Sequence, residues 1–378
     1  MDAPELAGRL PNASFAFRGY NQTNLGRTPE LLAHRVYGDV VRRWLREASQ
    51  LVREVSGRPC DLVARVESRT ETRLADYADA LALILAVELA QLELLRKFHG
   101  VEFQKSRYLF GYSFGEIGAM AAGGVWDLRS ALTIPVALSS DCIALAEGVT
   151  LGVLFSRSKE LCLHDVELAC MQVNQAGEGV VGLSTILSPN SVLLAGQGST
   201  LDRVLLKLHE VNNATVHLRK NDGLWPPMHT PIVWQRHLPN RAGDMLHTLS
   251  GGCTEPSPPI LSLVTGEMSY TPLNARDMIC RWMDRPQKLW DAVTKTMSLG
   301  IETVVHVGPE PNLIPATFRR LRTDVEAQLI NSLGLRALSA AVSRPWLRAL
   351  LPNQAAFLRA PHVEHVILED WLLETPVA

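Results

Sequence analysis

The chain has 378 residues, of which 47% are hydrophobic, and this suits a globular protein of one large domain with an insertion or of two domains. Its 37 basic and 39 acidic side chains leave a formal net charge of -2, which excludes a whole-protein field that would attract nucleic acid or an anionic membrane. The six cysteines form no C-x-x-C pair and no histidines stand at metal-site spacing, so we expect free thiols and no bound metal.

The N-terminal part of the chain reads as a short strand followed by helices. Residues 14–17 are predicted to be a strand that leads into a polar, glycine-containing loop. Residues 28–52 begin with threonine and proline, as many helices do, and are predicted to be helical. Residues 76–99 carry apolar side chains on nearly every side, which predicts a buried helix, and Gly100 is a suitable C-cap.

The segment YLFGYSFG, residues 108–115, has the pattern of a strand, a sharp turn and the start of a helix. Residues 108–110 read as a short buried strand, and residues 116–122 have helix-forming composition. The G-x-S-x-G turn between them exposes a serine hydroxyl at the end of the strand and at the positive end of the helix. Ser113 is therefore a candidate nucleophile, although the pentapeptide alone is also typical of an ordinary tight turn.

After the G-x-S-x-G turn and its helix, the pattern of predicted strands and helices changes. Asp127 is a suitable N-cap for a helix that Pro135 interrupts. Residues 149–220 then alternate short strands with helical stretches, and two β-α-β units in this length predict an inserted ferredoxin-like subdomain.

Strands and helices also alternate after the insertion. The segments PPILSLVTGE and IETVVHVGPEPNLIP read as strands, and RPQKLWDAVTKTMSLG reads as a helix. Alternation on both sides of the insertion predicts an α/β fold whose large domain, residues 1–148 and 221–337, has a mainly parallel sheet covered by helices. Residues 338–378 form a C-terminal extension with enough tryptophan and leucine to dock on the rest.

No segment is typical of membrane insertion or secretion. The most apolar run, residues 80–87, is ended by Glu88 and is too short to cross a bilayer. The first residues, MDAPELAGRLPNAS, lack the apolar core of a signal peptide. We expect a cytoplasmic protein without nucleic-acid or membrane partners.

A serine hydroxyl needs a base to take its proton near neutral pH, so a histidine is expected in the same cleft. Of the 11 histidines, five lie at a helix end, in the helices of the insertion or in the tail, where a solvated or packed imidazole is the better interpretation: His99, His164, His209, His362 and His365. His229 differs because it lies in the loop GLWPPMHTP, where the chain re-enters the large domain. It is the candidate base.

Five segments then occur in a recognisable order: FAFRGYNQTNLG, GYSFGE followed by AAGGVW, SPNSVLLAG, HTP and HVGPEPNL. With them the chain resembles the malonyl-CoA:acyl-carrier-protein transacylases and the acyltransferase domains of polyketide synthases over roughly residues 14–335. The segments look like that family's opening strand and loop, nucleophile elbow, insertion strand, histidine loop and closing strand. The resemblance implies an α/β-hydrolase-like large domain.

The resemblance also implies a role for each matching residue. Ser113 is the nucleophile, and His229 is the general base and then the general acid. The family's histidine is oriented by a backbone carbonyl, for which Trp282 is the closest match here. The oxyanion hole uses the backbone N–H groups of Phe114 and Tyr20. An exposed loop aspartate is the better interpretation of Asp222 than a third triad member.

Two positions depart from the family's pattern at the pocket. Tyr20 stands where the family has a glutamine, which keeps the backbone donor but places a phenol at the pocket mouth. The malonyl-selective members carry an arginine 25 residues after the serine, and this chain has Leu138 there. Leu138, Tyr112 and Met228 are assigned to the substrate pocket, and Arg129 is interpreted as a surface residue. A leucine offers no partner to a carboxylate, so we expect an uncharged acyl group to be preferred.

The leading hypothesis is an acyltransferase of fatty acid or polyketide biosynthesis. It moves an acyl group from acyl-CoA through an acyl-serine to the phosphopantetheine thiol of an acyl carrier protein, without a bound metal or cofactor. Carrier proteins are acidic, so Arg319 and Arg322 in FRRLR are the candidate docking surface, although a solvated helix face fits equally well. An acyl-thioester hydrolase with the same Ser113 and His229, and a non-catalytic interaction protein, remain alternatives.

Overall fold

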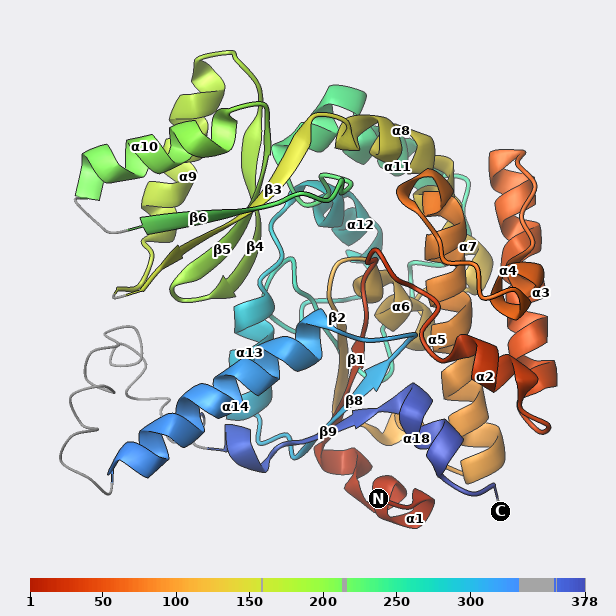
Figure 1. Cartoon of the computed structure of the whole chain (residues 1–378). Helices are drawn as coiled ribbons and strands as arrows, with labels where there is room; N and C mark the ends of the chain where they lie inside the picture. The colour runs from red at the N-terminus through yellow and green to blue at the C-terminus, as the bar shows by residue number, and fades with distance from the viewer. Residues whose placement is uncertain (158, 213–215, 333–356, 358, 378) are drawn as a thin grey trace.

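The structure is a computed structural model that describes residues 1–157, 159–212, 216–332, 357 and 359–377. Two sheets organise it (Figure 1). The larger sheet has five strands in the order β7-β2-β1-β8-β9, and all neighbouring strands are parallel. These strands are β1 (Ala13–Phe17), β2 (Tyr108–Gly111), β7 (Ile260–Leu261), β8 (Thr303–Val307) and β9 (Glu364–Ile367).

Helices cover both faces of the large sheet, which explains why β1, β2 and β8 are buried along their whole length. In β1, Phe15 and Phe17 belong to one hydrophobic cluster and the intervening Ala16 belongs to the other. The helices of the large domain are α1 (Ala3–Arg9), α2 (Thr28–Ala33), α3 (Gly38–Ser56), α4 (Leu62–Glu67), α5 (Tyr77–His99), α6 (Phe114–Ala122), α7 (Leu128–Ala137), α8 (Ser139–Ala146), α11 (Leu238–Leu246), α12 (Ala275–Asp284), α13 (Leu289–Ser298), α14 (Leu313–Ser332) and α18 (Leu368–Glu374).

The predicted helix at 28–52 is wrong in one respect, because it is two helices, α2 and α3. In the turn between them, Nδ1 of His34 accepts the backbone N–H groups of Val36 and Tyr37, both at 3.3 Å. The side chain thus satisfies donors that a continuous helix would pair with carbonyls. The buried helix α5 is confirmed, and its C-cap Gly100 has a φ of 65°.

The interruption expected after Asp127 is also present. Asp127 Oδ1 accepts the N–H of Ser130 at 2.7 Å and caps α7. Pro135 lies in the last turn of α7, and the chain bends by 40° between α7 and α8 at Leu138. Among the described residues no single helix is both long and apolar enough to span a membrane, and only the bent pair of α7 and α8 reaches that length and composition together.

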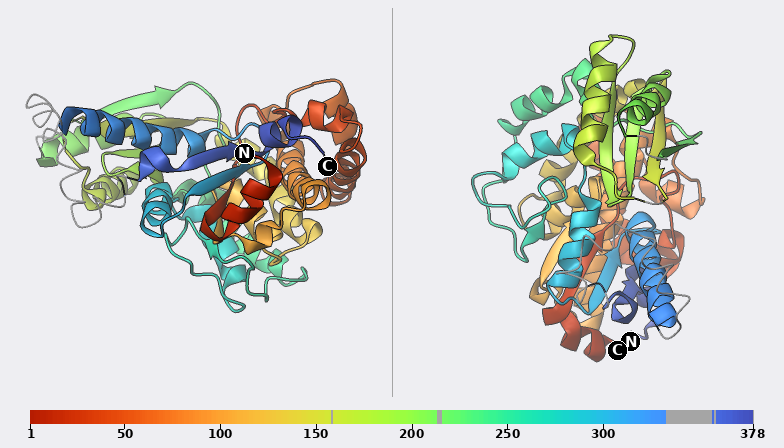
Figure 2. Two further views of the ribbon diagram at one scale, coloured as in Figure 1. Left: turned by 90° about the horizontal axis from the view of Figure 1, so that it is seen from below. Right: turned by 90° about the vertical axis from the view of Figure 1, so that its left-hand side faces the viewer.

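The smaller sheet has four antiparallel strands in the order β4-β5-β3-β6. Its elements are β3 (Val149–Ser156), α9 (Leu163–Gln175), β4 (Val181–Ser188), β5 (Ser191–Gln197), α10 (Thr200–Asn212) and β6 (Val216–Asn221). This βαββαβ order is ferredoxin-like, so the predicted fold class is confirmed. The small subdomain lies at one end of the molecule and both termini lie at the other (Figure 2).

The last described residues belong to the large domain. Strand β9 pairs in parallel with β8, and α18 packs on α5. The carboxylate of Glu369, at the start of α18, accepts the backbone N–H groups of Arg27 at 2.9 Å and Glu310 at 2.7 Å. The sequence assigned residues 338–378 to an extension. Strand β9 and helix α18, which lie in that range, complete the parallel sheet and pack on the large domain, while residues 338–356 lie outside the described residues.

Candidate active site

Ser113 lies at the sharp turn between β2 and α6. Its backbone has φ 54° and ψ −122°, a strained conformation for a residue with a side chain. A Cβ on Gly115 would collide with the carbonyl of Phe17, so only glycine lets α6 approach β1 this closely. The turn thus presents the serine hydroxyl at the start of α6.

His229 meets this serine from the loop after β6. Its Nε2 lies 2.8 Å from Ser113 Oγ, and its Nδ1 lies 2.6 Å from the carbonyl oxygen of Trp282. Because Nδ1 faces a carbonyl it carries the hydrogen, and the lone pair of Nε2 then points at the serine hydroxyl. Asp222 is exposed and is not the acceptor at Nδ1. The pair has the tautomer that a general base requires.

The environment of His229 favours the neutral imidazole. The residue is 3% exposed, and burial lowers its pKa from 6.5 to about 4, an effect that the hydrogen bond to the Trp282 carbonyl opposes only in part. Its own backbone, with φ 64°, is held by a hydrogen bond from its N–H to the carbonyl of Met283 at 2.6 Å. The base is therefore unprotonated and fixed in place near neutral pH.

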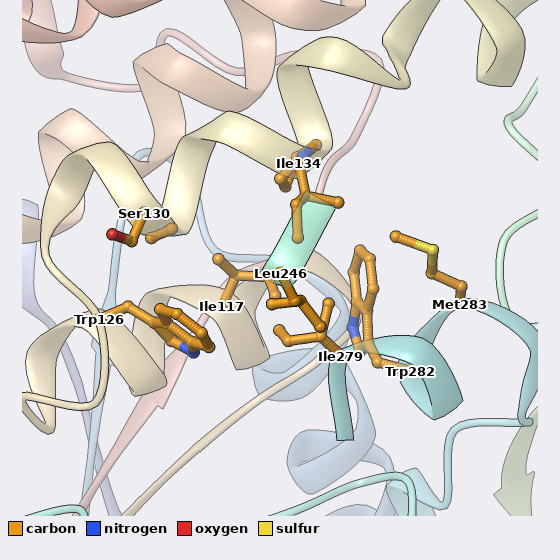
Figure 3. Close-up of a pocket in the computed structure, with 10 residues that line it drawn as sticks. Ile117, Trp126, Ser130, Ile134, Leu246, Ile279, Trp282 and Met283 are labelled. Atoms are coloured by element: carbon orange, nitrogen blue, oxygen red, sulfur yellow. The ribbon is translucent and has the colours of Figure 1, made fainter. Parts of the chain in front are cut away.

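Trp282, which lies on α12, makes two further contacts with the pair of Ser113 and His229. Its indole Nε1 donates to the backbone carbonyl of Ser113 at 2.8 Å, and its ring lies edge-on to His229 with centroids 5.3 Å apart. The ring also borders a small apolar cavity of about 10 Å³ together with Ile117 and Ile134 (Figure 3). The sequence pointed to the backbone of Trp282 only through the family resemblance, and nothing in it indicated the indole contact.

Gln287 is another neighbour that the sequence did not reveal. It is fully buried, and its Oε1 accepts the backbone N–H of Ser113 at 3.3 Å. A glutamine in a helix-flanking segment has no pattern that distinguishes a buried contact from a solvated one, so only the tertiary structure shows this bond.

Two segments that could supply an oxyanion hole converge on the elbow. Phe114 is the first residue of α6, whose first-turn N–H groups have no acceptors within the helix. Tyr20 follows Gly19, and a Cβ on Gly19 would collide with the carbonyl of Tyr112 beside the serine. The loop that carries Tyr20 therefore lies against the elbow, and the roles of the Phe114 and Tyr20 N–H groups stay predictions.

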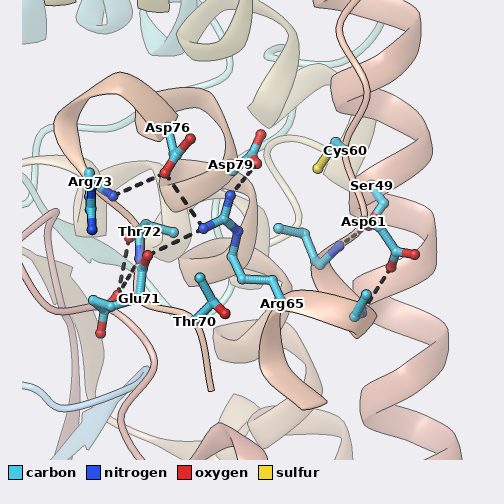
Figure 4. A network of polar contacts seen from close by, with 12 residues as sticks. Ser49, Cys60, Asp61, Arg65, Thr70, Glu71, Thr72, Arg73, Asp76 and Asp79 are labelled. Atoms are coloured by element: carbon cyan, nitrogen blue, oxygen red, sulfur yellow. Dashed lines mark hydrogen bonds and ion pairs between the residues drawn. The ribbon is translucent and has the colours of Figure 1, made fainter. Parts of the chain in front are cut away.

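A polar network holds that loop through Glu71, and Figure 4 shows the contacts of Glu71 and Arg65 within the network. Glu71 Oε1 accepts the backbone N–H of Asn24 at 2.9 Å. Arg65 donates to the Glu71 carbonyl at 3.3 Å and pairs with Asp79 at 3.1 Å. Because Asp79 lies in the first turn of α5, the loop that follows β1 is tied to a helix of the large domain.

A cavity of about 240 Å³ opens beside Ser113 and His229. The small subdomain contributes Leu151, Ser184, Leu193 and Asn221 to its wall. The large domain contributes an aromatic group in which Tyr20 contacts Tyr77 and Trp225 edge-on, with ring centroids 4.8 Å and 6.0 Å apart. Among the described residues that line the cavity none is an arginine, lysine, aspartate or glutamate.

The other residues assigned to the pocket separate into two groups. Tyr112 and Met228 line the cavity, as expected. Leu138 does not, because the bend after Pro135 turns it into the core, where it is 2% exposed. Counting 25 residues from the serine therefore does not lead to a pocket position.

The arginines named from the sequence all lie at the surface. Arg129 is paired with Glu54 at 2.6 Å and is 56% exposed, so it does not supply a cation to the cavity. Arg319 and Arg322 are exposed on α14, and Arg322 pairs with Glu326 at 2.8 Å. Within the part of the chain that the structure describes, no group of three or more histidine, cysteine or acidic side chains could hold a metal.

Sequence comparison identifies similarity to much longer proteins. No family model matches the chain. It is 23% identical over 301 residues to the reducing polyketide synthase ppsB of Aspergillus oryzae and 25% identical over 311 residues to the polyketide synthase GfsA of Streptomyces halstedii. These matches cover 73% and 81% of this chain, but it spans only 11% and 4% of the two relatives.

Solved structures match over 82% of the chain. They include FabD from Acinetobacter baumannii (TM-score 0.66, 18% identity, 91% of that chain) and an acyl carrier protein S-malonyltransferase from Vibrio cholerae (0.65, 22%, 93%). A third is a malonyl-transacylase solved in complex with its type II polyketide synthase acyl-carrier protein (0.62, 20%, 92%). The resemblance predicted from the sequence is thus confirmed as one of fold, which this chain shares with the malonyl-CoA:acyl-carrier-protein transacylases and a polyketide synthase acyltransferase domain.

Proposed function

We propose that this protein is an acyltransferase that moves an acyl group from coenzyme A to the phosphopantetheine thiol of an acyl carrier protein. The observation that carries the proposal is the hydrogen-bonded pair of Ser113 Oγ and His229 Nε2, 2.8 Å apart, at the edge of an uncharged cavity. The carrier as acceptor is supported by the related fold of a malonyl-transacylase solved with its carrier protein. The cytoplasmic location expected from the sequence stays a prediction.

The proposed reaction has two matching halves. Ser113 Oγ attacks the thioester carbonyl while His229 Nε2 takes the hydroxyl proton, and the backbone N–H groups of Phe114 and Tyr20 stabilise the oxyanion. Collapse of the tetrahedral intermediate breaks the carbon–sulfur bond, and His229 returns the proton to the departing thiolate. The carrier thiol then attacks the acyl-serine ester, and the same proton transfers run again with Ser113 as the leaving group. No metal or bound cofactor is required for these steps.

The lining of the cavity supports an uncharged acyl group. A malonyl group brings an ionised carboxylate into a site where no described lining residue is a lysine or arginine. Leaving that charge unpaired costs several kcal/mol, whereas methylenes gain about 0.8 kcal/mol each on burial. We therefore expect uncharged acyl groups to react about tenfold faster than malonyl or more.

The test is mass spectrometry of the intact protein after incubation with acetyl-, hexanoyl-, benzoyl- and malonyl-CoA, followed by addition of a carrier protein. We expect one acyl group per chain, fastest for an uncharged acyl, and its discharge onto the carrier. Equal discharge with and without carrier would make the protein a hydrolase. No acylation by any thioester would leave the non-catalytic alternative, and fastest reaction with malonyl would contradict the choice of acyl group.

A further inference from the structure

We propose that the side chains of Trp282 and Gln287 are positioning residues, which hold the main chain of Ser113 at the place where its hydroxyl meets His229. The inference deepens the proposed function and rests on it. Both side chains belong to the short segment 282–287, which spans the end of α12 and the loop after it.

This segment contacts both members of the pair. Its backbone holds His229, because the Trp282 carbonyl accepts Nδ1–H and the Met283 carbonyl accepts the histidine N–H, each at 2.6 Å. Its side chains hold Ser113, because Trp282 Nε1 donates to the serine carbonyl at 2.8 Å and Gln287 Oε1 accepts the serine N–H at 3.3 Å. The relative position of nucleophile and base is therefore set by one stretch of six residues.

The backbone strain at Ser113 explains why these two hydrogen bonds are needed. Ser113 has φ 54° and His229 has φ 64°, and both conformations are energetically unfavourable for a residue with a Cβ. Strained conformations persist only where their surroundings fix them. The two side-chain bonds clamp the peptide groups on either side of the Ser113 Cα, so their loss would let the turn relax and shift Oγ away from Nε2.

Packing alone does not explain either side chain. Gln287 is fully buried, and within the described part of the chain its Nε2 has no hydrogen-bond partner. An unpaired buried donor destabilises the fold, so the favourable polar contact of this amide is the one that Oε1 makes with Ser113. The Trp282 ring borders a small cavity of about 10 Å³ on one side (Figure 3), so its packing there is incomplete, and the indole hydrogen bond to Ser113 contributes to fixing the position of the ring.

The test compares Trp282→Phe and Gln287→Met with Trp126→Phe in the full chain. The first two remove one hydrogen bond each to Ser113 and keep the backbone carbonyls that hold His229. Trp126 borders the same small cavity and is 4% exposed, but its Nε1 has no partner among the described residues, so its replacement by phenylalanine is the matched control.

We expect the first-order acylation rate constant to fall about 10- to 100-fold in Trp282→Phe and Gln287→Met, with the half-saturating acyl-CoA concentration unchanged. Trp126→Phe should stay within about twofold of the wild type, since truncation without loss of a bond to Ser113 leaves the pair in place. Gln287→Glu keeps an acceptor for the serine N–H and should recover most of the rate. Equal losses in Trp282→Phe and Trp126→Phe at equal thermal stability would overturn the inference.

A second readout separates this inference from the proposed function. Phenylmethanesulfonyl fluoride modifies an activated serine without needing a thioester site, so its rate of reaction with Ser113 reports the pair alone. If no acyl-CoA acylates the wild type, the proposed function fails, and slower sulfonylation of Trp282→Phe still supports the positioning role. If the wild type is acylated and both variants are sulfonylated at its rate, the positioning role is wrong and the acyltransferase stands.

Discussion

The two sheets meet at one cavity but contribute to it in different ways. The parallel sheet is covered on both faces and carries Ser113 on the turn that follows its strand β2. The antiparallel sheet is covered by α9 and α10 on one face, and from its other face Leu151 and Leu193 reach the cavity. His229 follows β6, yet its hydrogen bonds tie it to α12 of the large domain.

Under the proposed function, this difference predicts that the reactivity of Ser113 and the preference for an acyl group depend on different parts of the molecule. The reacting atoms are held by elements with little room to move, because both faces of their sheet are packed. The opposite wall comes from the face of the antiparallel sheet that lines the cavity, where the partly buried Leu193 can change size without altering the turn at Ser113. Substitutions in the two regions should therefore alter different kinetic quantities.

The largest effect is expected at the elbow itself. Ser113→Ala should abolish the acyl-enzyme, on the order of 10⁴-fold or more, and His229→Ala should do nearly the same because the two residues act as a unit. Acylation followed by mass spectrometry measures both. His209→Ala, on α10 of the small subdomain, is the matched control. Acylation of the same peptide in Ser113→Ala would show that the nucleophile has been misassigned.

The pH dependence of acylation tests how deeply the pair is enclosed. Burial lowers the pKa of His229 to about 4, so the imidazole is a free base above that pH and becomes protonated, and inactive, as the pH falls through it. The single-turnover rate constant should be level from neutral pH to about pH 5 and about tenfold lower one unit below the pKa. An inflection near the ordinary value of 6.5 would mean that the histidine is exposed to water.

Smaller changes are expected from the wall that the small subdomain provides. Leu193→Ala enlarges the cavity and should shift the preference several-fold toward longer acyl chains, at about 0.8 kcal/mol per methylene accommodated. The reaction of Ser113 with phenylmethanesulfonyl fluoride should not change.

Leu194→Ala is the control, because this neighbour faces α10 and is fully buried. It should lower the free energy of unfolding by roughly 2–5 kcal/mol and leave the acyl preference as it was. A fall in sulfonylation rate in Leu193→Ala would show that the two regions are not separable.

The smallest effect concerns the surface of α14. Replacing Arg319 and Arg322 by glutamate should slow transfer to an acidic carrier several-fold, less at high salt, and leave acylation by acyl-CoA unchanged. Arg129→Glu, another exposed arginine, is the control. Equal loss in both half-reactions would contradict a docking role for this surface.

The sequence predicts best what short segments encode. The strand, G-x-S-x-G turn and helix at Ser113 follow from neighbouring residues, and the proline-rich loop singles out His229. The contacts of Trp282 and Gln287 with Ser113 join positions 169 and 174 residues apart, and no local pattern signals such pairs. Leu138 was misplaced for a related reason, since counting along the chain assumes an unbroken helix that Pro135 and the bend after α7 do not provide.

Strand β9 has a consequence for the way this molecule is made. During translation, β1, β2 and β8 leave the ribosome well before β9, whose pairing with β8 needs residues 364–367. Until then β8 is the open edge of the sheet, and its unpaired backbone groups can template strands of other nascent chains. Glu369 is also missing at that stage, so the N–H groups of Arg27 and Glu310 lack their acceptor. The large domain therefore completes its folding only after residues 364–369 have been synthesised, and growing chains that lack them are more exposed to aggregation.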